Sequence, residues 1–327
     1  MTTALVTGAS GFVGRRVVDV LLAAGVHVRA GVRHHGSEKA LPRRDDCEVV
    51  AIDICDARSL AGAMRGVDQL YHFAATVTSH TSAAKLLRVN AEGTRSVWEA
   101  AADAGIGKAL YCSSTAVYGL LAQNGQAVTE DILPRAVEPY GRSKLLGERI
   151  AAEIGAGREI DTVVIRPTAV FGPGEHTHFG SELRKAAVSR ILLGGGFRNK
   201  HFNFVHVDDV AAAAVHVMQL QKLSARVYNI VAEPSVSYEH AFQAYLRALD
   251  GAGYRFLRQR LLGQISVLIE RRPSLARRLR LHGRRSLAFG VWRPGFDMTF
   301  SSARLRETDF QFRWTDFEVV LRSCLDD

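Results

Sequence analysis

Thr7-Gly8-Ala9-Ser10-Gly11-Phe12-Val13-Gly14 is the stretch that decides the fold of this 327-residue chain. An apolar run from Ala4 to Val6 precedes it, and apolar residues at helical spacing follow it as far as Ala24. This order predicts a strand, a glycine turn and a helix, whose backbone amides and positive end can face a pyrophosphate. A tight turn without a ligand is the alternative, but the position at the first strand-to-helix junction favours dinucleotide binding.

The rest of the pattern extends this unit into an alternating α/β chain. Strands are predicted at residues 26–32, 47–52, 69–74, 109–112, 162–165 and 227–231, and helices at 60–64, 89–104, 140–154 and 210–220. Such alternation is typical of a doubly wound Rossmann-type parallel sheet. After Pro234 no strand alternation is visible, and arginine-rich helical patterns predict a smaller, mainly helical substrate cap. We therefore expect residues 1–168 and 203–232 to form the core, and residues 169–202 and 233–327 to form the cap.

The composition is that of an ordinary globular protein, with 47% hydrophobic and 23% charged residues. The four cysteines are widely spaced, and the histidines have no third partner at ligand spacing, so we expect neither a disulfide framework nor a metal site. Free thiols fit a reducing cytoplasm. The first residues run straight into the glycine turn without an export signal, and no apolar stretch approaches a membrane span. A cytoplasmic protein without an integral membrane segment is expected.

The net charge of +9 is concentrated in residues 255–285, which hold ten arginines and one acid, Glu270. A basic amphipathic helix can lie on an anionic membrane surface or cover a ligand, but it is more often a cap helix with its charges in solvent. Without interleaved aromatic residues or a recognised binding module, nucleic acid is not an expected partner. A small-molecule substrate is.

Tyr140 and Lys144 form a second informative pair, four residues apart in a predicted helix. Residues at this spacing share one helix face, and a cation there favours phenolate over phenol. The pKa of a tyrosine is thereby brought nearer to neutral pH, where acid and base catalysis is efficient. Ser113 and Ser114 follow the strand at 109–112, at the carboxyl edge where doubly wound sheets bind ligands. Ser114 is expected to hold a substrate oxygen, and a capping serine is the alternative.

The type of nicotinamide cofactor is predicted from the end of the second strand. About 20 residues past the glycines, an acid would hold the ribose hydroxyls of NAD. This chain has Arg33 there, and a guanidinium suits a 2′-phosphate, which favours NADP(H) and leaves NAD as the alternative. Arg33 can also be read as a solvated surface residue. Asp53, after the third strand, is placed to accept from the adenine amine or to serve as a loop carboxylate.

Further motifs accompany the glycine turn in order along residues 4–232. They are His72-Phe73-Ala74-Ala75, Asn90-Ala91-Glu92-Gly93-Thr94, Ser113 to Gly119, Tyr140 to Lys144, Arg166-Pro167 and Val205 to Val210. The set resembles the extended branch of the short-chain dehydrogenase/reductases. The resemblance implies that Tyr140 is the acid or base, that Lys144 lowers its pKa and holds the nicotinamide ribose, that Ser114 orients the substrate oxygen, and that Asn90 supports a proton relay.

The resemblance also implies a cofactor site, and it is compatible with a homodimer. The residues expected at the cofactor are Gly8, Ser10, Gly11, Phe12, Val13, Gly14, Arg33, Asp53, Ile54, Ala74, Ala75, Tyr140, Lys144 and Pro167.

The extended branch contains nucleotide-sugar epimerases or dehydratases as well as reductases of less polar carbonyl compounds. Many sugar-nucleotide members resemble one another in an asparagine shortly after the Arg166 position, where this chain has Ala169. They also commonly carry an arginine for the diphosphate where this chain has Phe202, and a phenyl ring cannot neutralise a diphosphate. Arg198, Lys200 or a cap arginine would have to supply that charge instead.

The sequence therefore favours an NADP(H)-dependent reductase or dehydrogenase that acts on a ketone or secondary alcohol of a small molecule. A nucleotide-sugar epimerase or dehydratase with tightly held NAD is the alternative. A cofactor-bound sensor without turnover is a third hypothesis, which the intact set of Ser114, Tyr140 and Lys144 disfavours.

Overall fold

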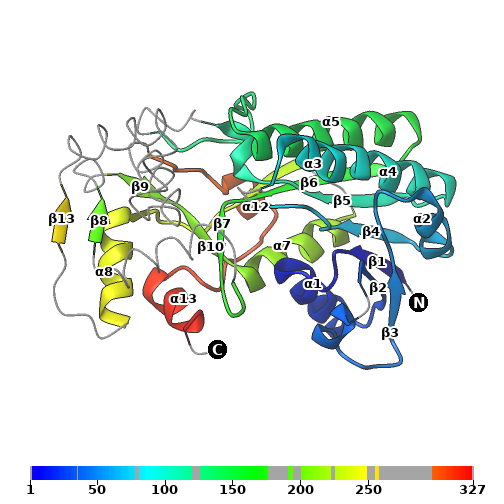
Figure 1. Ribbon diagram of the computed structural model, residues 1–327, viewed down its shortest axis with the longest axis horizontal. Coiled ribbons are helices and arrows are strands. Elements are labelled where there is room, and N and C mark those ends of the chain that lie inside the picture. Colours follow the sequence, from blue (N-terminus) through cyan, green and yellow to red (C-terminus); the bar gives the residue numbers. More distant parts are fainter. Residues whose placement is uncertain are drawn as a thin grey trace, which may run out of the picture.

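The computed structural model is organised around one long parallel sheet with helices on both faces and a smaller unit at one end (Figure 1). The structure describes residues 2–34, 36–77, 81–119, 126–175, 191–193, 200–221, 225–248, 255–257 and 297–325. Most of the arginine-rich segment and Arg198 lie outside these residues.

The main sheet has seven strands in the order β11-β6-β5-β4-β1-β2-β3. Their bounds are β1 Thr3–Thr7, β2 His27–Val32, β3 Cys47–Ala51, β4 Gln69–His72, β5 Lys108–Cys112, β6 Asp161–Pro167 and β11 Val227–Ile230. Every pairing is parallel, with Thr7 in register with Gly31 on one side and with His72 on the other. The predicted doubly wound parallel sheet is confirmed.

Helices cover the two faces of this sheet and enclose two apolar clusters. They are α1 Phe12–Ala23 and α7 Val207–Gln219 on one face, and α2 Ala57–Met64, α4 Gly93–Asp103 and α5 Pro139–Gly157 on the other (Figure 1). Leu21 and Val210 are buried in the first cluster, and Leu60 and Trp98 in the second. Each helix buries one apolar stripe, as its 3.6-residue period predicts.

Short helical segments complete the core: η1 Ser37–Ala40, α3 Ala83–Leu87, the π-helix η2 Arg88–Glu92 and the 3₁₀-helix η3 Thr115–Tyr118. The helix predicted over residues 89–104 is therefore two segments, because η2 precedes α4 with the wider π-turn. Gly93 N–H donates to the carbonyl of Arg88, five residues back. Such π-turns occur often at functional sites.

The order of the strands reverses between β1 and β4. From β1 the chain proceeds outward to β2 and β3, and it then returns to build β4, β5, β6 and β11 on the opposite side. The helices that follow β1 and β4 therefore diverge onto opposite faces of the sheet. A crevice at the carboxyl ends of such strands is where doubly wound sheets bind their ligands.

The smaller unit contains short strands as well as helices. Its elements are β7 Ala169–Phe171, β8 Ile191–Leu193, β9 His201–Phe202, β10 Phe204–His206, β12 Val236–Ser237, α8 Tyr238–Ala248, β13 Arg255–Leu257, α12 Ala303–Arg306 and α13 Phe317–Ser323. β12 pairs with β9 and β13 pairs with β8, so two short strands occur after Pro234, where the sequence shows no strand alternation. Strands of two or three residues are too short to leave a visible period in the sequence.

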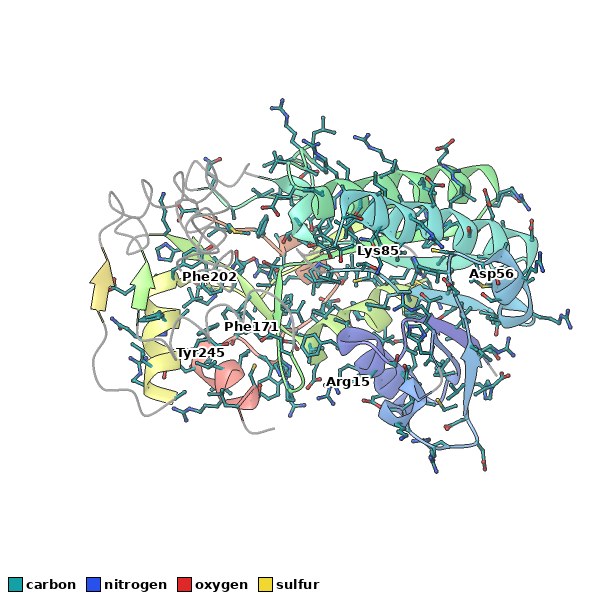
Figure 2. The ribbon with its side chains drawn as sticks, viewed as in Figure 1. Arg15, Asp56, Lys85, Phe171, Phe202 and Tyr245 are labelled. Atoms are coloured by element: carbon teal, nitrogen blue, oxygen red, sulfur yellow. The ribbon has the colours of Figure 1, made fainter. Side chains whose placement is uncertain are left out.

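An aromatic core holds the smaller unit together. Phe171, Phe202 and Phe204 surround Phe317, with ring centroids 5.5, 6.0 and 5.1 Å away. Figure 2 shows Phe171 and Phe202 on this side of the molecule, well away from Asp56 at the far end of the sheet. We retain the division into core and cap as a proposal with two adjustments. β10 is assigned to the cap, because Phe204 packs in its aromatic core. The segment around Leu305 is assigned to the core, because Leu305 packs in the first cluster of the sheet.

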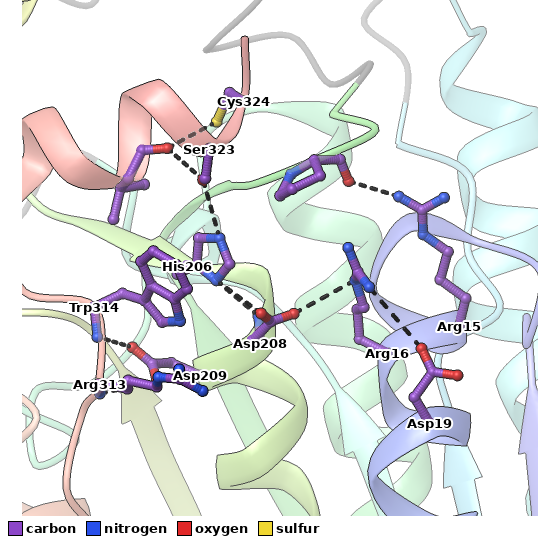
Figure 3. A network of polar contacts seen from close by, with 12 residues as sticks. Arg15, Arg16, Asp19, His206, Asp208, Asp209, Arg313, Trp314, Ser323 and Cys324 are labelled. Atoms are coloured by element: carbon purple, nitrogen blue, oxygen red, sulfur yellow. Dashed lines mark hydrogen bonds and ion pairs between the residues drawn. The ribbon is translucent and has the colours of Figure 1, made fainter. Parts of the chain in front are cut away.

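A polar network joins α7 to the C-terminal segment (Figure 3). The Asp209 carboxylate accepts from the backbone N–H groups of Arg313 and Trp314, at 3.0 and 2.9 Å. His206 lies 3.2 Å from the Ser323 hydroxyl and stacks on Trp314 at 4.1 Å. These contacts fix the cap against the core on the side of α1 and α7.

Candidate functional site

The glycine turn between β1 and α1 forms a cradle in which side chains would not fit. Gly8 has φ 69°, and a Cβ there would lie 2.7 Å from the backbone nitrogen of Ala74. A Cβ at Gly14 would overlap the carbonyl oxygen of Gly8, so the start of α1 packs directly on the turn. The first turn of α1 carries no acidic residue, so nothing there opposes an anion at the positive end of the helix. The turn therefore fits a pyrophosphate.

Neighbouring strands fix this turn in place. The N–H of Ala9 donates to the carbonyl of Gly31 at 3.1 Å, and the N–H of Ala74 donates to the Thr7 hydroxyl at 3.3 Å. Ser10, Phe12 and Val13 are half-buried along the turn, and Ala75 is half-buried after β4. The sheet thus brings the predicted cofactor residues of β1 and β4 to one edge.

The residues predicted to select the cofactor lie at the carboxyl ends of β2 and β3. Arg33 is exposed just after β2, and its Nε lies 2.9 Å from Nε2 of His34. Asp53 is exposed after β3, and its carboxylate accepts from the N–H of Cys55 at 2.9 Å. Ile54 is buried, and its side chain packs against Gly93 at the start of α4. Arg33 thus lies exposed at the carboxyl end of β2, the edge at which the sequence predicts the adenosine ribose.

Two glycines let α5 approach the sheet closely. A Cβ at Gly141 would overlap the carbonyl oxygen of Ala116, and one at Gly147 would overlap the hydroxyl of Tyr111. Gly141 directly follows Tyr140, and Gly147 lies three residues after Lys144 in the same helix. The absence of two side chains therefore brings this pair of residues against β5 and η3.

Lys144 is buried, so its ammonium group lacks the water that normally surrounds a lysine side chain. Its side chain is 2% exposed, and Nζ lies 4.2 Å from the centroid of the Tyr111 ring. Burial lowers the pKa of Lys144 to about 8, opposed by the nearby Cys112 thiol and Glu148 carboxylate. Tyr140, one turn earlier, is half-buried, and its charge contributes to raising the pKa of Tyr111. Tyr140 and Lys144 therefore both lie near the Tyr111 side chain.

Ser114 and Ser113 differ in what their hydroxyls do. Ser114 is half-buried at the N-cap of η3, and its Oγ accepts from the N–H of Ala116 at 3.2 Å. A capping hydroxyl still has its own proton to donate. Ser113 is buried, and its hydroxyl has no hydrogen-bond partner among the residues that the structure describes. Both interpretations of Ser114 from the sequence thus fit its position.

Asn90, in the π-helix η2, connects three segments. Its amide pairs with the backbone of Thr76, accepting at 2.8 Å and donating at 2.9 Å. The same amide nitrogen donates to the Ser143 hydroxyl at 3.0 Å, and Ser143 donates to the carbonyl of Tyr140 at 2.7 Å. Asn90 therefore holds the backbone of Tyr140 in position, a contact that the sequence does not reveal.

A buried ion pair supports α5 one turn after Lys144. Arg166 donates to both carboxylate oxygens of Glu148, at 2.9 and 2.7 Å, and to the hydroxyl of Tyr118 at 2.7 Å. Bidentate geometry of this kind fixes both partners. Pro167 follows Arg166 as the buried last residue of β6. The Arg166-Pro167 motif thus locks α5 to the sheet below Lys144.

Three cap positions bear on the choice of substrate. Phe202 is 2% exposed, with its ring 4.8 Å from that of Tyr238, and Ala169 is half-buried against the same aromatic core. Lys200, a candidate for neutralising a diphosphate, pairs with Asp297 at 2.9 Å. Within the described part of the cap, these positions do not present an unpaired cation to a diphosphate.

Reasoning from the sequence missed several residues of the site. Tyr111, Glu148 and Ser143 were given no role, and neither were the two close-packing glycines. Glycines inside a strongly predicted helix were the available signal, since such residues cost helix stability unless a packing reason keeps them. In the ranges that the structure describes there is no cluster of His, Cys, Asp or Glu suited to a metal ion, and no helix is long and apolar enough to cross a bilayer.

A doubly wound sheet with a dinucleotide cradle at its switch point and a Tyr-Lys pair beside it defines a class of nicotinamide-dependent proteins. The model of the NAD dependent epimerase/dehydratase family matches residues 4–231. The chain belongs to this family, and with it to the extended short-chain dehydrogenase/reductase type of enzymes.

Relatives in sequence include proteins of several organisms. The chain is 32% identical to the uncharacterized protein y4nG of Sinorhizobium fredii over 70% of its length, and to sterol demethylase protein B of Methylococcus capsulatus over 66%. These matches cover 56% and 66% of the two relatives. A 3 beta-hydroxysteroid dehydrogenase/Delta 5-->4-isomerase of Mycobacterium tuberculosis is 28% identical over 79% of the chain and 72% of the relative.

Solved structures share the fold across the cap as well as the core. UDP-glucuronic acid 4-epimerase from Bacillus cereus, in complex with NAD, aligns with a TM-score of 0.77 at 20% identity. The alignment covers 99% of this chain and 98% of the epimerase. At this identity the likeness establishes the fold alone.

Proposed function

We propose that this protein is an NADP(H)-dependent reductase or dehydrogenase that acts on a ketone or secondary alcohol of an apolar small molecule. The observation that carries the proposal is the buried Lys144 one turn after Tyr140, at the carboxyl edge of the sheet beside the dinucleotide cradle. Burying a cation costs free energy, and groups perturbed in this way are concentrated at functional sites. Stabilising a phenolate is a function that a buried lysine beside a tyrosine can serve.

The residues divide the chemistry among them. When bound, the nicotinamide supplies or takes up a hydride at the substrate carbon. Tyr140 donates a proton to the substrate oxygen during reduction, and Lys144 stabilises the phenolate that remains. Ser114 donates a hydrogen bond from its hydroxyl to the same oxygen, while Asn90 and Ser143 hold the backbone of Tyr140. Asn90 is also proposed, by resemblance, to support the return of the proton.

The cofactor would be held by the glycine turn and by residues at the ends of β2, β3 and β4. The amides of the turn would receive the pyrophosphate, and Arg33 would pair with a 2′-phosphate, which favours NADP(H). Asp53 and Ile54 would flank the adenine, and Lys144 would also hold the nicotinamide ribose. NAD remains the alternative, since solved relatives of the fold bind it.

An apolar substrate is supported by the cap. The buried Phe202, the paired Lys200 and the alanine at position 169 leave the described cap poorly suited to a nucleotide diphosphate. Two relatives are named for sterol or steroid chemistry, which agrees with an apolar carbonyl compound as substrate.

The first experiment identifies any nucleotide that co-purifies and then titrates the stripped protein with NADPH and NADH by fluorescence. A strong preference for NADPH, lost in Arg33→Ser, would support a reductase that exchanges its cofactor in each cycle. Tightly retained NAD without a preference for the phosphate would contradict it and favour an epimerase or dehydratase that recycles its own hydride.

Tyr140→Phe then tests the chemistry with a panel of steroid ketones and other apolar carbonyl compounds. We expect the affinity for NADPH to change by less than about twofold, because the nucleotide contacts remain. Turnover, followed as NADPH oxidation, should fall by about 100-fold or more, since proton transfer by a positioned side chain contributes on this order. Undiminished turnover would remove Tyr140 as the acid.

A further inference from the structure

A continuous chain of buried hydrogen bonds connects the cofactor cradle to the catalytic helix. The Thr7 hydroxyl lies 2.7 Å from Nδ1 of His72, and Nε2 of His72 lies 3.2 Å from the Thr94 hydroxyl. Thr94 donates to the carbonyl of Asn90 at 2.9 Å. Beyond Asn90 the chain continues through Ser143 to the backbone of Tyr140. It spans β1, β4, α4, η2 and α5.

The donors and acceptors along this chain have one consistent direction. Thr94 gives its proton to the carbonyl of Asn90, so its oxygen must accept from Nε2–H of His72. Nδ1 of His72 is then an acceptor, and the Thr7 hydroxyl donates to it while accepting from the N–H of Ala74. The network thus assigns the tautomer of His72.

His72 stays neutral in this arrangement. Its burial, together with the nearby charge of Lys144, lowers the pKa of His72 to about 3. Thr7, His72, Thr94, Asn90 and Ser143 are each at most 1% exposed, so water does not compete for their hydrogen bonds. Distorting this network costs free energy, because breaking any one of its hydrogen bonds leaves buried polar groups without partners in a low-dielectric interior.

We propose that His72 and Thr94 are positioning residues that couple occupation of the glycine turn to the order of the catalytic helix at Tyr140. The inference rests on the proposed function, because it requires a dinucleotide on the turn. Phosphates bound at the turn would restrain Gly8 and Ala74, whose contacts with Thr7 begin the chain. The restraint would pass through His72 and Thr94 to Asn90, which holds the first turn of α5.

Two variants of Thr94 isolate the chain. Thr94→Val keeps the shape of the side chain but removes the hydroxyl that links His72 to Asn90, and Thr94→Ser keeps the hydroxyl. Thr162→Val is the matched control, because Thr162 is also a buried threonine that accepts a hydrogen bond, from Nε1 of Trp98 at 3.0 Å. Thr162→Val therefore reproduces the loss of a buried hydroxyl outside the chain.

The probe is ADP, which carries two phosphates for the turn but has no nicotinamide that could touch Tyr140. Hydrogen exchange of the amides in residues 139–147 is measured with and without saturating ADP. We expect ADP to slow this exchange by about threefold or more in the unaltered protein, Thr94→Ser and Thr162→Val, and to have little effect in Thr94→Val. A hydrogen-bond network that transmits order predicts this difference.

Kinetics supply a second readout once a substrate is known. Thr94→Val should lower kcat by about tenfold with the affinity for NADPH changed less than about twofold, since small misplacements of a catalytic group have effects of this order. Thr94→Ser should restore kcat. Thr162→Val should keep the kcat of the unaltered protein when its loss of thermal stability equals that of Thr94→Val.

The failures of the two proposals can be told apart. If ADP binds but leaves the exchange of residues 139–147 unchanged in the unaltered protein, the coupling is overturned and the proposed cofactor site stands. If Thr94→Val responds to ADP as the unaltered protein does, the path through His72 is overturned. If ADP does not bind, the proposed dinucleotide site is itself removed, and the coupling with it.

Discussion

Lys144 shows how one buried residue links chemistry to stability. Its ammonium is held against the ring of Tyr111 and beside Glu148, away from water. Because burial penalises the charged form, the folded protein holds this proton less tightly than an exposed lysine does. At pH 7 the group is still mostly protonated, with a pKa of about 8, as the proposed stabilisation of a phenolate at Tyr140 requires. The cost of burying it appears in the stability of the fold.

The pH dependence of unfolding should reveal that cost. The folded pKa of about 8 lies below the ordinary value of 10.5, so between these pH values the unfolded chain binds more protons than the folded one. The contribution of Lys144 to the free energy of unfolding therefore rises with pH across this window. Relative to Lys144→Met, the unaltered protein should gain up to about 3 kcal/mol from pH 8 to 10.5.

Urea unfolding at a series of pH values checks this prediction. Lys85→Met is the control, since Lys85 is an exposed lysine of α3 (Figure 2), and its curve should run parallel to that of the unaltered protein. Parallel curves for Lys144→Met as well would mean that the burial of Lys144 does not perturb its proton affinity.

At the scale of elements, α5 depends on glycines that its helical period does not require. Gly141 allows the helix to contact the backbone of η3, and Gly147 allows it to contact the backbone of η2 and the Tyr111 hydroxyl of β5. Gly157 stands at the end of the helix, where an added Cβ would meet no described atom within 4 Å. Each interior glycine lowers the intrinsic stability of a helix. Close approach offsets that loss at the first two positions, because it seats Lys144 against Tyr111.

Gly147→Ala and Gly157→Ala should therefore have opposite effects on stability. At Gly147 a Cβ would lie 2.6 Å from the carbonyl oxygen of Asn90, so α5 must shift, and we expect a loss of about 1–3 kcal/mol. At Gly157 the added methyl meets open space and should stabilise the protein by about 0.5 kcal/mol. Chemical denaturation measures both. Equal effects of the same sign would show that α5 is not held by close packing.

At the scale of the whole molecule, the cap has its own aromatic core and is fixed to the sheet by a few polar contacts. Phe317 of α13 lies among the rings of β7, β9 and β10, so one side chain joins three strands of the cap. Asp209 and His206 then tie the same C-terminal segment to α7 (Figure 3). The cofactor cradle lies on the other unit, in the turn after β1.

Phe317→Ala should loosen the cap and leave the cradle intact. Truncating a buried phenylalanine costs about 3–5 kcal/mol, so hydrogen exchange in α8 and α13 should become faster. Val319→Ala, at a half-exposed position of the same helix, should change stability by less than about 0.5 kcal/mol. ADP affinity should stay the same in both variants. A parallel loss of ADP affinity in Phe317→Ala would show that cap and core unfold as one unit.

The fold of the core and the elements that hold the site could be predicted from the sequence. The glycine turn, the α/β alternation and the pair Tyr140 and Lys144 are local patterns, and the structure places each of them on the element that its period predicts. The cap was predicted less well. Its short strands pair only through contacts with distant segments, as β12 does with β9, and pairings of this kind leave no period to read.

What the sequence determined by itself is the local chemistry: a glycine turn of the kind that accepts phosphates, a phenol and an ammonium on one helix face, and an arginine where an acid would select NAD. Only the tertiary structure decided how these parts are held. His72 meets Thr7 and Thr94 across 65 and 22 positions of the chain. Spacing along the chain fixes which residues share a helix face or a strand end, but hydrogen-bond partners from separate elements are chosen by how the sheet and helices pack.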